Sequence, residues 1–248
     1  MLKRLLIENY ALIDHLDISF PGELVIITGE TGAGKSILLG ALSLVLGGRR
    51  DTYRVLHLFA QTIGHLTEGE LLQMQKATSA DTCQEDYMRI IYGKTASLFE
   101  STALSAALSV GASEEVTRAM GDYALQLGLA FQIKDDIFDY SDQAKALGKP
   151  VGIDLKEQKI TQPLLCALGK VPAQEQKRIR GLVARISDNP SLADEVTAFV
   201  KAQDGVSLAV TQMDIHIQTA ISLLDILPHT RAKDCLKELA LLVGQRES

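Results

Sequence analysis

The sequence predicts a mainly α-helical protein in which a helical bundle is preceded by a small β-strand, phosphate-loop and helix segment. From about residue 53 onward, apolar residues recur with the helical period and no convincing strand pattern is found. Over about the first fifty residues, short apolar runs typical of strands precede a glycine-rich loop. This change of pattern predicts two units, residues 1–52 and 53–248, and a hydrophobic content of 46% is enough to bury a core.

The first unit is expected to contain two strands and one helix. The apolar runs Leu5–Ile7 and Leu24–Ile27 are typical of short strands, and Pro21-Gly22 places a turn before the second run. A helix is expected over residues 35–46, where Gly47-Gly48 ends it.

The second unit is expected to be helical throughout. Ser113 is a good N-cap, and Glu114 and Glu115 after it are the first-turn acids that favour a helix start. Pro172 and Pro228 mark loops. We expect helices near residues 54–77, 85–110, 114–141, 159–169, 174–187, 191–202, 204–227 and 229–245.

Composition excludes several classes of function. The formal net charge of −6 argues against a general nucleic-acid binder, which normally presents a basic surface. The cysteines Cys83, Cys166 and Cys235 are far apart and form no CxxC pair, so neither a zinc site nor a disulfide framework is expected. Charged residues interrupt the first twenty positions, and no apolar run reaches about 18 residues, so we expect no signal peptide, no membrane span and a cytoplasmic location.

A phosphate-binding loop is predicted near the N-terminus. Residues 29–36 fit the pattern G-x-x-x-x-G-K-[ST], with an apolar strand before them and a helix after them. The backbone N–H groups around Gly29, Gly32 and Gly34 would wrap a phosphate, while Lys35 would reach the outer phosphates and Ser36 would hold magnesium. The motif implies ATP as the ligand, and an ordinary glycine-rich turn is the alternative.

The residues around this loop resemble the start of RecN, a bacterial repair ATPase related to the SMC proteins. The resemblance is carried by residues 5–13, 28–36 and 46–49, and ends there. No later strand ending in an acidic pair follows. Because hydrolysis needs an acid to hold magnesium and position water, the loop is expected to bind phosphate without working as an ATPase.

An aspartate-rich segment closes the helix expected over 114–141. Asp135 and Asp139 are four residues apart and share one helix face, with Asp136 about 100° round. Acids are unfavourable at a helix C-terminus and repel one another, so three of them favour a bound cation. Oxygen ligands favour Mg²⁺. A solvated acidic helix end is the alternative.

Basic residues accompany these acids. Lys149 and Lys159 follow on a glycine-bearing stretch, and lysine binds phosphate as a point charge. Lys94 and Thr95 lie within an earlier expected helix, where an inward lysine needs a partner; a lysine that snorkels to solvent is the alternative. Carboxylates, metal and lysines together predict a diphosphate site.

Four segments in this order resemble the trans-polyprenyl diphosphate synthases, and octaprenyl-type members in particular: residues 69–73, 93–99, the FQ-x-x-DDxxD segment at 131–139, and 148–163. The resemblance covers residues 54–248 and implies an isoprenoid-synthase-type helical bundle, here partial, in a transferase that condenses an allylic diphosphate with isopentenyl diphosphate. It implies that Asp135, Asp136 and Asp139 hold Mg²⁺. It also implies diphosphate contacts, with catalytic roles, for Lys94, Thr95, Gln132 and Lys149, and a further contact for Lys159.

The family pattern also contains an earlier DDxxD motif followed by paired arginines, which this sequence lacks. The part that binds isopentenyl diphosphate is missing as well, so the isolated chain is expected to be weak or inactive as a synthase. Two other functions stay open: an ATP-binding repair-protein fragment, and a non-catalytic helical partner of a complete synthase. Family resemblance implies a homodimer or heterodimer.

Overall fold

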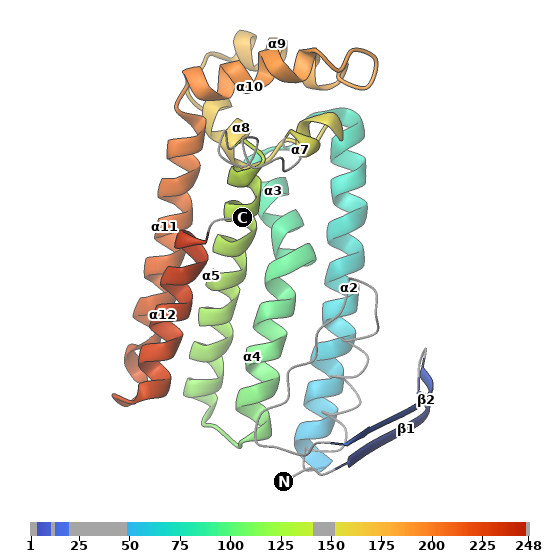
Figure 1. Ribbon diagram of the computed structural model, residues 1–248, viewed down its shortest axis with the longest axis vertical. Helices are drawn as coiled ribbons and strands as arrows, with labels where there is room; N and C mark the ends of the chain where they lie inside the picture. Colours follow the sequence, from blue (N-terminus) through green and yellow to red (C-terminus); the bar gives the residue numbers. More distant parts are fainter. Residues whose placement is uncertain (1–3, 11–12, 20–48, 141–151, 247–248) are drawn as a thin grey trace.

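The computed structural model describes residues 4–10, 13–19, 49–140 and 152–246 (Figure 1). Two strands, β1 (Arg4–Tyr10) and β2 (Ile13–Ser19), come first. The helices that follow are α2 (Arg49–Ser79), α3 (Gln84–Ile91), the π-helical turn η1 (Tyr92–Ala96), α4 (Ser97–Ser109), α5 (Glu114–Phe138), α7 (Ile153–Lys156), α8 (Gln162–Leu168), α9 (Ala173–Val183), α10 (Leu192–Ala202), α11 (Gly205–Leu223), the 3₁₀ turn η2 (Leu224–Ile226) and α12 (Arg231–Gln245).

The long helices lie side by side, and the short ones close one end of the bundle (Figure 1). α5 packs between α4 and α11, and α12 packs on both α5 and α11. α9 and α10 cross the end of the bundle, with α7 and α8 just beneath them. The end of α5 that carries the aspartates therefore lies close to α3, α7 and α8.

The first unit is only partly described. β1 and β2 pair antiparallel, with Arg4 opposite Ser19, and Arg4 Nε donates to Asp17 Oδ1 at 2.8 Å. β1 confirms the strand predicted at residues 5–7, whereas β2 was missed although polar and apolar residues alternate over residues 15–19. The predicted strand at 24–27, the loop at 29–36 and the helix at 35–46 lie outside the described residues.

Over the described residues from 54 onward the helical prediction is confirmed, and α5 has the predicted start. The side chain of Ser113 accepts a hydrogen bond from the backbone N–H of Val116, as an N-cap does. α5 ends at Phe138 rather than at residue 141, and its inward side chains include the fully buried Ile133. α2 begins at Arg49, so the boundary proposed at 52/53 falls within its first turn.

One helix expected over 85–110 is interrupted by the π-turn η1. Glycine allows the turn to lie against α2: a Cβ on Gly93 would stand 2.5 Å from the carbonyl oxygen of His65. π-bulges inside helices often occur at functional sites. Here the turn carries Lys94 and Thr95 and places them between α2 and α5.

The described helices give no membrane span, since none of them combines enough length with enough apolar character to cross a bilayer.

Candidate functional site

A cavity of about 90 Å³ lies at the closed end of the bundle, among α2, α3, η1, α5 and the segment from α7 to α8. Its wall combines a few apolar side chains with a larger number of polar ones. The polar residues are Gln73, Thr82, Tyr87, Lys94, Gln132, Asp136, Asp154, Lys159 and Thr161. Four of the residues predicted from sequence, Lys94, Gln132, Asp136 and Lys159, therefore line one cavity.

A chain of hydrogen bonds fixes the cavity side of α5. Thr95 Oγ1 donates to Gln132 Oε1 at 2.7 Å, and Gln132 Nε2 donates to Asp136 Oδ1 at 3.1 Å. The hydroxyl of Tyr87 donates to the other carboxylate oxygen, Oδ2, at 2.6 Å. Asp136 is 4% exposed, so both of its oxygens are held by protein donors with little access to water. The carboxylate, the amide and the hydroxyl thus have one defined arrangement.

Two acids of the cavity, the buried Asp136 and the partly buried Asp154, have raised pKa values. Burial, and next the charge of Asp154, raise the pKa of Asp136 to about 7. Burial, and next the charge of Asp139, raise the pKa of Asp154 to about 6. In each case negative charge is concentrated where little water can solvate it, so a cation placed here would be stabilised by both carboxylates.

Two lysines face these acids. The ammonium of Lys94 lies 2.9 Å from Glu70 Oε2 and donates to Gln73 Oε1. Lys159 lies 3.8 Å from Asp154 and pairs with Glu157. Burial acts to lower the pKa of Lys159, but the hydrogen bond to Glu157 and the charge of Asp154 outweigh it, and the pKa is raised. Lys159 is therefore held charged and Lys94 is paired with Glu70, so both side chains could bind an anion at the cavity.

The three aspartates of α5 and its C-cap have different partners. Asp136 faces the cavity. The carboxylate of Asp139 accepts hydrogen bonds from the backbone N–H groups of Ile153 at 2.9 Å and Asp154 at 3.1 Å, and so ties the end of α5 to the start of α7. Asp135 pairs with Arg246, beyond the end of α12. The three carboxylates therefore face different neighbours in the structure, because each is already held by its own partner.

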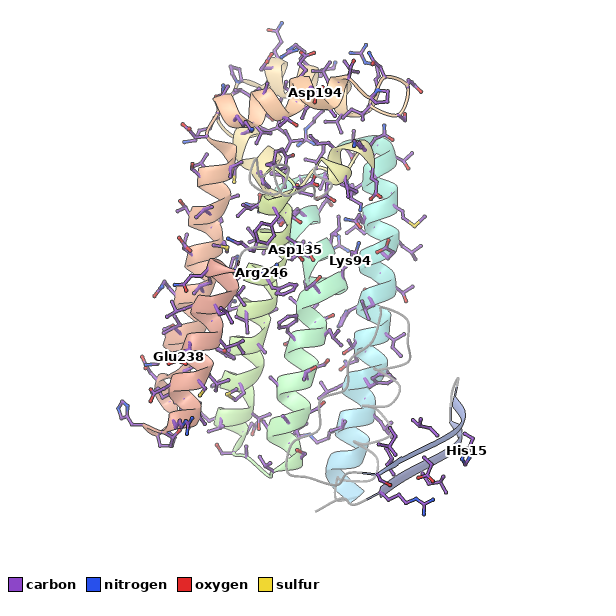
Figure 2. All side chains as sticks on the ribbon, in the orientation of Figure 1. His15, Lys94, Asp135, Asp194, Glu238 and Arg246 are labelled. Carbon is purple, nitrogen blue, oxygen red and sulfur yellow. The ribbon has the colours of Figure 1, made fainter. Side chains whose placement is uncertain are left out.

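Figure 2 shows this separation directly. Lys94 lies on the side of α5 that faces α2, and Asp135 meets Arg246 on the side that faces α12. Burial raises the pKa of Asp135, and Arg246 offsets that rise only in part.

The donor chemistry of the cavity fits Mg²⁺. Asp136 and Asp154 supply carboxylate oxygens, and Mg²⁺ in proteins is commonly held by one or two carboxylates with waters and substrate phosphates. Among the described residues, no group of three His, Cys, Asp or Glu side chains is placed to hold a metal by itself. The cavity thus provides part of a coordination shell, and the assignment of Asp135, Asp136 and Asp139 as metal ligands stays a prediction.

Two sets of predicted residues cannot be placed. Lys149 and the loop residues Gly29, Gly32, Gly34, Lys35 and Ser36 lie outside the described residues. Their phosphate-binding roles stay predictions.

Sequence reasoning missed Tyr87, Asp154 and Arg246. Asp154 stands within the loop quoted for its lysines, so its place beside them was the available signal. Tyr87 is 2% exposed and looks like an ordinary core residue of α3. Arg246 is 111 residues from Asp135 in the chain, and nothing local indicates their pairing.

Comparison with known proteins shows what this chain is similar to. Residues 31–202 match the family model described as polyprenyl synthetase. An octaprenyl diphosphate synthase of Haemophilus influenzae is 35% identical over 221 residues, covering 88% of this chain and 67% of the relative. Component 2 of the heptaprenyl diphosphate synthase of Geobacillus stearothermophilus is 31% identical over 196 residues, covering 78% of this chain and 59% of the relative.

Solved structures give the same picture. A polyprenyl synthase from Caulobacter crescentus, complexed with calcium and isoprenyl diphosphate, superposes with a TM-score of 0.74 and 27% identity. The match covers 86% of this chain and 64% of that one. This chain therefore spans only about three fifths to two thirds of the proteins that it resembles.

Proposed function

The chain belongs to the polyprenyl synthetase family, and we propose that it binds an allylic prenyl diphosphate with Mg²⁺ at the cavity among α2, α3, η1, α5 and α7. The proposed reaction is the condensation of that allylic diphosphate with isopentenyl diphosphate. The observation that carries the proposal is that Lys94, Lys159 and Gln132 line one cavity with the buried Asp136 and the partly buried Asp154.

Each of these groups has a distinct proposed task. Lys94 and Lys159 hold oxygens of the diphosphate as charged donors. Gln132 is oriented by Thr95, which fixes its oxygen and leaves its amide directed at Asp136. Bound Mg²⁺ would neutralise charge that develops on the departing diphosphate. Asp136 and Asp154 would hold it, with Asp135 and Asp139 as the further ligands predicted from sequence.

The chemistry follows from that charge arrangement. The bond between the allylic carbon and its diphosphate oxygen breaks, and the electron pair leaves with the diphosphate. Lysines that already sit at the diphosphate stabilise the leaving group without reorganisation. The alkene of isopentenyl diphosphate forms the new carbon–carbon bond, and a proton is then lost from the adduct.

We further propose that the isolated chain performs this reaction weakly. The first aspartate-rich motif and its arginines are absent from the sequence, and losing stabilisation of this kind costs about 10²-fold or more in rate. A partner chain that carries the missing half would restore it, as a homodimer or a heterodimer. The resemblance to a synthase named as component 2 supports the heterodimeric arrangement.

Two alternatives are kept as outcomes of the same experiment. One is ATP binding at residues 29–36, which rests on the sequence motif alone. The other is a helical partner without a substrate of its own, which the paired acids and lysines of the cavity do not favour.

Calorimetric titration of the purified chain with farnesyl diphosphate, with Mg²⁺ and then with excess chelator, tests the proposal. We expect binding that needs Mg²⁺ and that K94Q weakens about 10- to 100-fold, the loss expected for a charge-assisted contact to a phosphate. D136N should abolish the magnesium dependence. K177Q and D214N change the same charges at exposed positions and should bind as the wild type does.

Binding that ignores both chelator and K94Q would contradict the proposal. ATP binding without farnesyl diphosphate binding would favour the nucleotide alternative, and binding of neither would favour the non-catalytic partner. Labelled isopentenyl diphosphate added to the same mixture then reports whether condensation occurs.

A further inference from the structure

Arg246 follows the last residue of α12 and reaches across to α5. Its guanidinium lies 3.8 Å from the ring centroid of Phe131 and 5.5 Å from that of Phe138. Nη2 donates to the backbone carbonyl oxygen of Phe131 at 3.0 Å and pairs with the carboxylate of Asp135. The guanidinium is therefore held by two rings, a carbonyl and a charge, and only 26% of the side chain is exposed.

The ring pair makes this a defined seat for the arginine. Phe138 has Lys134 on it as well, with the ammonium 5.0 Å from the ring centroid, while Phe131 packs on Phe99 of α4. A planar guanidinium stacks well on such faces and keeps a fixed direction, which a lysine ammonium does not. The seat directs Nη2 at Asp135, the first acid of the DDxxD segment.

We propose that Arg246 is an internal counter-ion of Asp135 that competes with the divalent cation for this carboxylate. The inference rests on the proposed function, because that proposal takes Asp135 as a further metal ligand beside the cavity acids Asp136 and Asp154. In the metal-free chain the guanidinium neutralises Asp135. A cation that takes the carboxylate must displace Nη2, so the pairing energy is subtracted from the metal's binding energy.

The neighbouring acid lacks such a competitor. Asp136 accepts its hydrogen bonds from a hydroxyl and an amide, which are neutral donors that leave its charge in place. Asp135 instead faces the full positive charge of Arg246. Arg246 consequently sets a threshold for metal binding. The metal, alone or with its diphosphate, binds Asp135 only when that interaction is stronger than the ion pair with Arg246.

The test measures Mn²⁺ binding, with Mn²⁺ as a spectroscopically visible substitute for Mg²⁺ at oxygen sites. Free Mn²⁺ is counted by electron paramagnetic resonance in titrations of the wild type, R246Q, R246K, D135N and D135N/R246Q. We expect R246Q to bind Mn²⁺ about three- to tenfold more tightly, the range that a half-exposed ion pair stacked on aromatic rings supports. R246K keeps the charge but loses the stacked, fixed geometry, so its affinity should fall between those of the wild type and R246Q. The control R231Q removes an exposed arginine at the start of α12 and should change nothing.

The double variant separates competition from a structural effect. If Arg246 acts through Asp135, R246Q raises affinity in the wild type and has no effect once Asp135 is asparagine. Circular dichroism melts of each variant establish that the helices are intact. Equal Mn²⁺ affinity of wild type and R246Q would overturn the inference and leave the metal site standing. Equal gains from R246Q and R246K would overturn it too, since the cause would be packing and not charge. No Mn²⁺ binding by any variant would overturn the metal site and this inference together.

Discussion

The two sides of the end of α5 differ in how they hold charge. On the cavity side, Asp136 is 4% exposed and takes its hydrogen bonds from Tyr87 and Gln132. On the α12 side, the side chain of Asp135 is 42% exposed and is paired with Arg246. These are consecutive residues of one motif, yet one is a buried acid fixed by neutral donors and the other a half-exposed member of an ion pair.

A sequence motif of acids therefore does not define one electrostatic site. Helical geometry turns neighbouring side chains about 100° apart, so each meets a different neighbouring element. Whether an acid can bind a cation then depends on the side chains that contact it. Asp136 has only neutral donors, so its raised pKa would fall once a cation binds, whereas Asp135 already has a counter-ion.

The largest loss of stability is expected on the cavity side of α5. Y87F removes the hydroxyl that donates to Asp136 at 2.6 Å and leaves a buried carboxylate oxygen without its donor. At about pH 8, above the Asp136 pKa of about 7, we expect a loss of about 2–3 kcal/mol in the free energy of unfolding, the cost of a hydrogen bond to a charged buried group. Urea unfolding measures it.

A second tyrosine gives the matched control. Tyr123 is 3% exposed and donates to the carbonyl oxygen of Leu236 at 2.8 Å, a neutral acceptor. Y123F should cost about 0.5–1.5 kcal/mol. Equal losses for the two variants would show that the charge of Asp136 adds nothing, and the contrast between the two sides of α5 would lose its basis.

Much of this arrangement could be predicted from the sequence, and the reasons are local. The period of the apolar residues and the Ser113 cap predict α5, because both act within a few turns of one helix. Lys94, Gln132 and Asp136 were predicted as one site from the family resemblance, and they do line one cavity. The π-turn η1 was not predicted, since residues 84–109 contain no proline and Gly93 alone marks the turn.

The remaining features depend on contacts between distant segments. Tyr87 meets Asp136 across 49 residues and Arg246 meets Asp135 across 111, and no local pattern encodes either pairing. The expectation that the three aspartates share one cation came from considering their helix without the elements that pack on it. Once α7 and α12 are packed, Asp139 caps one helix and Asp135 turns to the other.

A smaller loss of stability is expected for a change at Asp86 of α3, next to Tyr87. Like Asp135, this acid is paired with a cation. Its carboxylate lies 2.9 Å from Lys76 of α2 and accepts the backbone N–H of Cys83 at 3.1 Å. The Lys76 hydrogen bond, and next that of Cys83, lower the pKa of Asp86 to about 2. Because the folded-state pKa is lowered, the contribution is present above pH ~4 and is lost as the pH falls toward 2.

D86N should therefore cost about 1 kcal/mol at pH 7, a value discounted for solvent screening at the surface. The difference from wild type should shrink in urea unfolding at pH 3 and below. A constant difference from pH 7 to pH 2.5 would mean that Asp86 acts by shape and not by charge.

The smallest loss of stability is expected on the α12 side, and it tests whether the two sides of α5 differ. R246Q removes a half-exposed ion pair and its stacking on Phe131, so we expect a loss of about 0.5–1 kcal/mol in the free energy of unfolding. High salt should reduce the wild-type advantage, because screening weakens a partly solvated pair, whereas the Y87F loss should hardly change with salt. Urea unfolding of both variants at low and high ionic strength measures this. If R246Q costs as much as Y87F, or if its cost resists salt, Arg246 is a structural anchor of α12 rather than a counter-ion that a metal can displace, and the two sides of α5 are alike in kind.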